Sequence, residues 1–176
     1  MGTMSLMATL VLTVVGDDRS GLVAAVADVV GSNGGNWERS QLAELAGAFA
    51  GIIEVSVPDV RVDELRAALS DLDGLLTITA HPGSTGADAA SPRSFAFTVL
   101  GNDRPGIVRE ITSTLTAHGV SIDRMSTETR DAAMSGGRLF EATIAAKAPA
   151  SVDVDAAQAA LEELAAEIQV DVTLSV

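Results

Sequence analysis

A segment of eight residues occurs twice in the chain, and this repeat constrains the fold more than any other feature. The first copy is Gly16–Val23 (GDDRSGLV) and the second is Gly101–Val108 (GNDRPGIV), 85 residues further along. Each copy follows a run of apolar residues that predicts a strand, Thr9–Val15 in one case and Phe95–Leu100 in the other. Each copy also precedes apolar residues at helical spacing. The sequence therefore predicts two related domains that each begin with a strand, a turn and a helix.

The pattern of apolar residues continues in the same order in both halves. In the first half it predicts helices and strands at Leu22–Val30, Trp37–Leu45, Phe49–Val57, Val62–Leu72 and Leu75–Ala80. In the second half the corresponding elements are Ile107–Leu115, Val120–Thr129, Arg138–Ala146, Val154–Ile168 and Gln169–Val176. In the second hairpin, the polar residues Asp131–Gly137 predict an insertion at the tip. The order β-α-β-β-α-β predicts an α+β protein of two tandem ferredoxin-like domains, each a four-stranded antiparallel sheet with both helices on one face.

A stretch with the composition of a flexible linker, residues 81–92, separates the two predicted domains. The domains themselves are residues 5–80 and residues 93–176. In domains this small the sheet face without helices is partly apolar, and it requires a partner. We therefore expect the two domains to pair with each other or with a second chain, most simply in a homodimer.

The charge of the chain argues against binding to nucleic acids or to membranes. There are 11 basic and 24 acidic residues, and neither half of the chain is basic. A protein that binds DNA or RNA directly, or an anionic membrane, needs a cationic surface. The apolar stretch Leu6–Val15 is far shorter than the roughly 20 residues of a transmembrane helix, and the absence of cysteine fits a reducing compartment. We therefore expect a cytoplasmic protein.

Residue sets for catalysis are missing from the sequence. We find no Ser/His/Asp set, no paired histidines, no cysteine and no Gly-Lys-Ser/Thr loop for phosphates. An RNA-recognition module would need exposed aromatic residues on its sheet, whereas this chain has no tyrosine and four phenylalanines. We therefore expect no enzyme, no catalytic residues, no metal site and no cofactor.

The segment Asp103–Val108 and its degenerate copy Asp18–Val23 resemble the first turn of ACT domains. The likeness covers nearly the whole chain, and two such units resemble the glycine cleavage system transcriptional repressor family. The resemblance implies a regulatory protein that binds a small ligand, often an amino acid, and that acts on a protein partner. In this family ligands bind at interfaces between ACT units, near this turn and near the start of the second strand. The residues at these positions are Asp18, Arg19, Gly21, Leu22, Asn36, Asp103, Arg104, Gly106 and Ile107.

Physical chemistry gives this turn a reason to bind an amino acid. The N–H groups at a helix N-terminus and the positive end of the helix dipole attract a carboxylate. The main chain near Gly21 or Gly106 would supply these donors, and Asp18 or Asp103 would pair with the α-ammonium group. The amide of Asn36 both donates and accepts hydrogen bonds, whereas the second unit has serine at that place. We therefore expect two unequal sites, with the first favoured.

The same residues also have purely structural interpretations, which the sequence leaves open. Asp18 and Asp103 fit the N-cap position of a helix, the two arginines fit a solvated or interface position, and Gly21 and Gly106 fit tight packing of a helix against a sheet. An alternative function is a protein-protein interaction module that docks to a metabolic enzyme or regulator and binds no metabolite.

Overall fold

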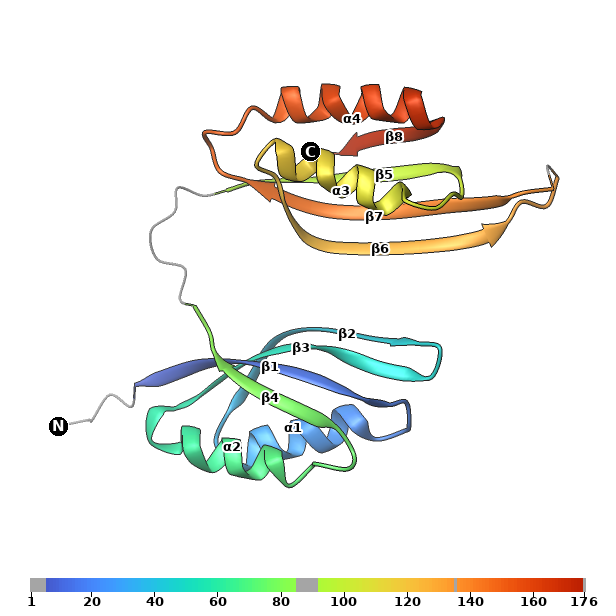
Figure 1. The fold of residues 1–176 in the computed structure, drawn as a ribbon. Helices are drawn as coiled ribbons and strands as arrows, with labels where there is room; N and C mark the ends of the chain where they lie inside the picture. The colour runs from blue at the N-terminus through green and yellow to red at the C-terminus, as the bar shows by residue number, and fades with distance from the viewer. Residues whose placement is uncertain (1–5, 85–91, 135, 176) are drawn as a thin grey trace. The chain divides into compact units, whose positions relative to one another are not determined.

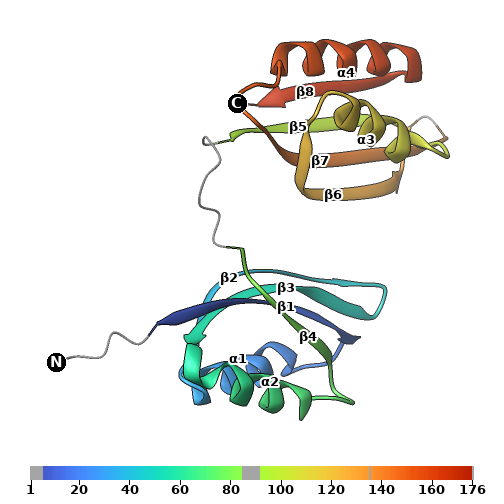
Figure 2. The ribbon, with the colours of Figure 1, turned by 60° about the vertical axis from the view of Figure 1, so that its left-hand side comes forward.

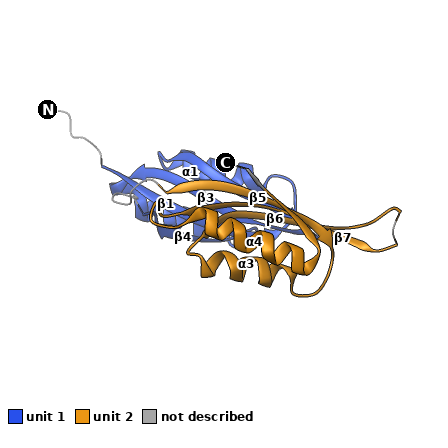
Figure 3. Ribbon diagram, turned by 90° about the horizontal axis from the view of Figure 1, so that it is seen from above, with its two compact units in different colours: residues 1–86 blue, residues 87–176 orange. Residues whose placement is uncertain are grey.

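The computed structural model describes residues 6–84, 92–134 and 136–175. The chain divides into two compact units, residues 1–86 and residues 87–176, which Figure 3 shows in different colours. The predicted domain limits at residues 5 and 176 and most of the predicted linker, residues 85–91, lie outside the described residues.

Unit 1 is a four-stranded antiparallel sheet with two helices on one face (Figure 1). Its elements are β1 (Met7–Asp17), α1 (Leu22–Ser32), β2 (Asn36–Leu45), β3 (Ala48–Pro58), the short 3-10 helix η1 (Asp59–Arg61), α2 (Val62–Ser70) and β4 (Thr77–Pro82). The strand order is β2-β3-β1-β4, so that β1 lies between β3 and β4.

Unit 2 repeats this arrangement, and Figure 2 shows its helices on one face of its sheet. Its elements are β5 (Arg93–Asn102), α3 (Ile107–Ala117), β6 (Ser121–Asp131), β7 (Arg138–Ala148), α4 (Val154–Ile168) and β8 (Val170–Ser175). The strand order β6-β7-β5-β8 is the one found in unit 1. The predicted fold class, two tandem β-α-β-β-α-β domains, is therefore confirmed.

The core of unit 1 is formed by apolar residues that alternate along β1 and by apolar residues at helical spacing in α1. In β1, Leu10, Leu12 and Val14 point to the helix side and are almost fully buried. In α1 the buried residues Leu22 and Val26 stand four apart and face them. Burying a side chain of this size contributes about 1.5 to 3 kcal/mol each. Unit 2 buries the same pattern in β5 and α3.

The first glycine of each repeated segment allows the chain to pack closely beside the turn. A Cβ on Gly16 would lie 2.8 Å from Cδ2 of Leu76, and one on Gly101 would lie 2.4 Å from Cγ1 of Val170. These neighbours lie where the chain enters β4 and β8. The two glycines thus hold the last strand of each unit against the end of the central strand, next to the predicted site.

Two details of the predicted elements are corrected. His81 and Pro82, predicted to begin the linker, extend β4 and pair with Val11 and Leu10. The helix α2 ends at Ser70, two residues before its predicted end. The extra residues of the second hairpin lie at its tip as predicted, between the end of β6 and the start of β7, with residue 135 outside the described residues.

Candidate functional site

The two predicted binding turns join β1 to α1 and β5 to α3. Each helix begins after a glycine in the left-handed region, Gly21 with φ +90° and Gly106 with φ +88°. The first helical hydrogen bond of α1 runs from the N–H of Ala25 to the carbonyl oxygen of Gly21, at 3.0 Å. The N–H groups ahead of that bond have no acceptor within the helix. The side chains of Leu22 and Ile107 are buried in the cores, so these two residues can offer a ligand their main chain only.

The aspartates of the turns do not cap the helices, which corrects that interpretation. Gly21 and Gly106 occupy the N-cap positions, and among the described residues no side chain caps α1 or α3. The aspartates instead anchor the turns through their main chain. The N–H of Asp18 donates to the carbonyl oxygen of Gly47 at 2.9 Å, and the N–H of Asp103 donates to that of Arg138 at 2.8 Å. The carboxylate of Asp18 lies on an exposed residue, where a ligand can reach it.

Close helix packing is also not the reason for the N-cap glycines. Among the described residues, a Cβ on Gly21 would meet nothing within 4 Å, and one on Gly106 would meet only Oε1 of Glu110, at 3.8 Å. The positive φ is what requires glycine, because it costs an L-residue roughly 1 to 2 kcal/mol. The space in front of Gly21 is open, so a ligand can approach the main chain there.

An open depression adjoins each turn, on the side of the last strand. In unit 1 it measures about 200 Å³ and is lined by Val15, Gly16, Asp17, Arg19, Gly74, Leu75, Leu76 and Thr77. In unit 2 it measures about 560 Å³ and is lined by Arg104, Glu110, Leu164, Glu167, Ile168 and Gln169. In unit 1 the second wall is the connection from α2 to β4, and in unit 2 it is the end of α4 together with Gln169. Sequence reasoning missed this wall, because nothing in the pattern shows that it folds back onto the turn.

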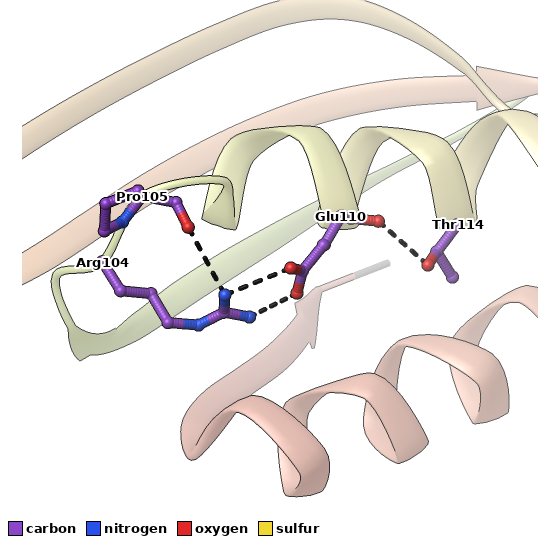
Figure 4. Close-up of polar contacts among 4 residues, drawn as sticks. All are labelled: Arg104, Pro105, Glu110 and Thr114. Carbon is purple, nitrogen blue, oxygen red and sulfur yellow. Dashed lines mark hydrogen bonds and ion pairs between the residues drawn. The ribbon is translucent and has the colours of Figure 1, made fainter.

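The two turn arginines, which are 85 residues apart, differ in their partners. Arg104 binds both carboxylate oxygens of Glu110, and its Nη1 donates to Oε1 at 3.1 Å (Figure 4). The hydrogen bond from Arg104 lowers the pKa of Glu110, and the same bond raises the pKa of Arg104. Arg19 is exposed, and within the described part of the chain it has neither an ion pair nor a side-chain hydrogen bond. Arg19 is therefore available to an external anion, whereas Arg104 is engaged.

Asn36 begins β2 as predicted, at the opposite end of the sheet from the turn of its own unit. It is level with Ser56 and, through β3, with Thr9, whereas the turn follows Asp17. At about 3.3 Å per residue this separates Asn36 from the turn by roughly 25 Å along the strands. The amide of Asn36 donates to Oε1 of Glu38 at 2.9 Å. The structure thus brings together the turn residues within each unit, but it does not bring Asn36 to the turn of its own unit.

We also searched the described residues for a membrane-spanning helix and for a metal site. Residues 6–84, 92–134 and 136–175 contain no helix that is long and apolar enough to cross a membrane. In the same ranges, no three histidine or carboxylate side chains gather in a way suited to a metal ion.

Comparison with known proteins gives the same division of the chain. Residues 8–81 and residues 96–169 each match an ACT domain family. The glycine cleavage system transcriptional repressor of Escherichia coli K12 is 28% identical, over 99% of this chain and 93% of that protein. The crystal structure of an unknown protein from Galdieria sulphuraria superposes with a TM-score of 0.87, at 28% identity over 97% of this chain and 98% of that one. The structure of a putative glycine cleavage system transcriptional repressor gives 0.68 at 20% identity, with the same coverage, and shows the fold alone. With both units matched, the chain belongs to the ACT domain family as a tandem of two ACT domains.

Proposed function

We propose that this protein is a non-catalytic regulator that binds a small ligand, an amino acid, at the turn of unit 1 and relays its binding to a protein partner. The observation that carries the proposal is that the turn of unit 1 is accessible and, in the part of the chain that the structure describes, has unpaired groups that can bind a ligand. The N-terminus of α1 has no side-chain cap among the described residues, and the space before Gly21 is open. A charged residue of each sign, Asp18 and Arg19, is exposed beside it.

The charges of the turn match those of an amino acid. The carboxylate of the ligand would accept hydrogen bonds from the N–H groups near Gly21 and Leu22 and pair with Arg19. The ammonium group would pair with Asp18. The side chain would enter the depression beside Leu75 and Leu76, whose volume of about 200 Å³ favours a small amino acid.

The relay would run through a protein, because the chain is too acidic to bind DNA directly. A net charge of −13 disfavours contact with a duplex, which binds proteins whose cationic surface displaces its counterions. The name of the relative from Escherichia coli, a transcriptional repressor of the glycine cleavage system, supports a role in the control of amino-acid metabolism or its transcription. A ligand with different affinities for two arrangements of the protein would shift their populations and change the surface presented to the partner.

The first test is a thermal-shift screen of the full chain against the proteinogenic amino acids. A ligand that binds only the folded state at 100 times its Kd stabilises it by about 2.7 kcal/mol, and we expect one or two amino acids to raise the Tm selectively. A flat screen, confirmed by calorimetry at millimolar ligand, would favour the docking module that binds no metabolite.

Variants then locate the site. Asp18→Ala and Arg19→Ala should abolish the shift without changing the Tm of the free protein, because both residues are exposed. The matched control is Arg39→Ala, which removes an exposed arginine that pairs with Glu54 on the sheet. Unchanged binding in the turn variants would show that the turn is not the site. Asn36→Ala is tested separately, because Asn36 lies far from the turn of its own unit. Weaker binding in this variant would indicate that Asn36 of a second copy of the chain completes the site.

A further inference from the structure

We infer that Glu110 closes the turn of unit 2 to ligands. Its carboxylate is bound to Arg104 in the way that the carboxylate of a ligand would bind to Arg19 in unit 1. The chain would then bind one carboxylate ligand, in unit 1, although it carries two ACT turns. The inference rests on the proposed function in one respect, that a carboxylate is what the open turn takes.

The pair occupies the end-on edge of the Arg104 guanidinium, the edge formed by its two terminal nitrogens. Both terminal nitrogens of the guanidinium bind Glu110, one to each carboxylate oxygen, and Nη1 also lies 3.5 Å from the carbonyl oxygen of Pro105 (Figure 4). Oxygen Oε1 lies 3.8 Å from the Cβ position of Gly106, over the start of α3. The side chains of Arg104 and Glu110 are 36% and 32% exposed, so the pair is half-buried. A bidentate pair in this setting holds both partners firmly.

The charge around the turn of unit 2 also opposes a second anion. Glu110 and Glu167 both line the depression, against the single cation of Arg104. A ligand carboxylate would have to displace Glu110, leave that carboxylate half-buried without its partner, and approach Glu167 as well. The depression of unit 2 is larger than that of unit 1, but two acids and one arginine line it, whereas Asp17 and Arg19 are the charged residues that line the depression of unit 1. The lining of unit 2 therefore carries one more negative charge.

Comparison of the repeats shows that unit 1 lacks the carboxylate that pairs with the turn arginine in unit 2. The helix position of Glu110 corresponds to Ala25 in unit 1, 85 residues earlier, and both are half-buried one turn after the N-cap glycine. Alanine offers no carboxylate to Arg19. The same turn is therefore open in one unit and closed by its own helix in the other.

The test uses acetate, the smallest stable carboxylate probe, and follows the amide signals of Gly21 and Gly106 by NMR in the 15N-labelled full chain. Sodium acetate is titrated against sodium chloride at equal ionic strength. Glu110→Ala opens the second turn, and Ala25→Glu closes the first. Glu163→Ala is the matched control, because it removes an exposed carboxylate from the same unit and leaves the pair intact. Far-UV circular dichroism checks that each variant is folded.

In the wild type and in the control, we expect a saturable shift at Gly21 and none at Gly106. Glu110→Ala should strengthen acetate binding at Gly106 by roughly tenfold or more, as expected when a competing charged hydrogen bond is removed. Ala25→Glu should weaken binding at Gly21 by a similar factor. Equal responses of both glycines in the wild type would overturn the inference, and so would the absence of any response in every variant. A flat amino-acid screen together with the expected acetate pattern would instead refute the proposed function and leave the inference standing.

Discussion

Two glycines of the helix α1 should respond in opposite directions to the same substitution. Gly21 lies at the N-cap with φ +90°, and Gly31 is the penultimate residue of the helix, outside the left-handed region. A Cβ at either position meets nothing within 4 Å in the part of the chain that the structure describes, so steric overlap does not distinguish the two substitutions. Only the backbone conformation distinguishes Gly21→Ala from Gly31→Ala.

The expected free energies follow from that conformation. Alanine in the left-handed region costs roughly 1 to 2 kcal/mol, and the smaller entropy of the unfolded chain returns about 0.4 to 1 kcal/mol. Gly21→Ala should therefore destabilise unit 1 by about 1 kcal/mol. Gly31→Ala should stabilise it by about 0.5 to 1 kcal/mol, because alanine is the better helix former. The two variants should differ by roughly 2 kcal/mol.

The fluorescence of Trp37 makes the measurement specific to unit 1. It is the only tryptophan of the chain, and it packs partly buried against the core of that unit. With a urea m-value of about 1 to 2 kcal/mol/M for a domain of this size, the two midpoints should stand about 1 to 2 M apart. Equal midpoints, or a higher midpoint for Gly21→Ala, would refute the claim that the turn requires glycine for its φ.

Three further predictions concern unit 2. Gly101→Ala should destabilise the unit by about 2 kcal/mol or more, because the new Cβ would lie 2.4 Å from Cγ1 of Val170 and 2.9 Å from its Cα; an unchanged Tm by circular dichroism would contradict this packing. Asp153→Ala should cost about 1 kcal/mol, since this carboxylate caps α4, and Asp153→Asn should keep most of the stability in the same melt. Because Arg104 holds the pKa of Glu110 below its ordinary value of 4.5, the stability from this pair should be complete above that pH and should decline as the pH falls below it, until Glu110 is protonated in the folded state. Glu110→Gln should remove this part of the acid dependence, and an identical pH profile in the variant would show that the pair contributes nothing.

The fold could be predicted from the sequence because local and global patterns agree. Leu10, Leu12 and Val14 alternate along a strand that is buried on one face, and the repeat supplies the same evidence a second time. The start of α1 could not be located in the same way. An aspartate three residues before a glycine fits either an N-cap or the entry to a turn, and the positive φ of Gly21 decides between them.

The candidate site could be predicted only in part. The turn residues follow from the repeated segment, but the second wall of each depression comes from residues far away in the sequence, such as Gly74–Thr77. The pair of Arg104 and Glu110 spans six residues across a turn and the first turn of a helix, which is not the i,i+4 spacing that marks ion pairs within a helix. Its effect on ligand access depends on where the turn directs the guanidinium, and no local pattern specifies that direction.

The outer strands of the hairpins share a feature that bears on whether a further strand can pair with them. β2 and β6 each have a neighbour on one side only, and an unpaired strand edge invites edge-to-edge aggregation. Both strands are interrupted by a bulge at the same place in the repeat, between Trp37 and Arg39 and between Ile122 and Arg124. The residue left out of register is an acid each time, Glu38 or Asp123. A bulge and an acidic residue both disfavour the pairing of a further strand, so the repeat protects the same edge in each unit at the same position.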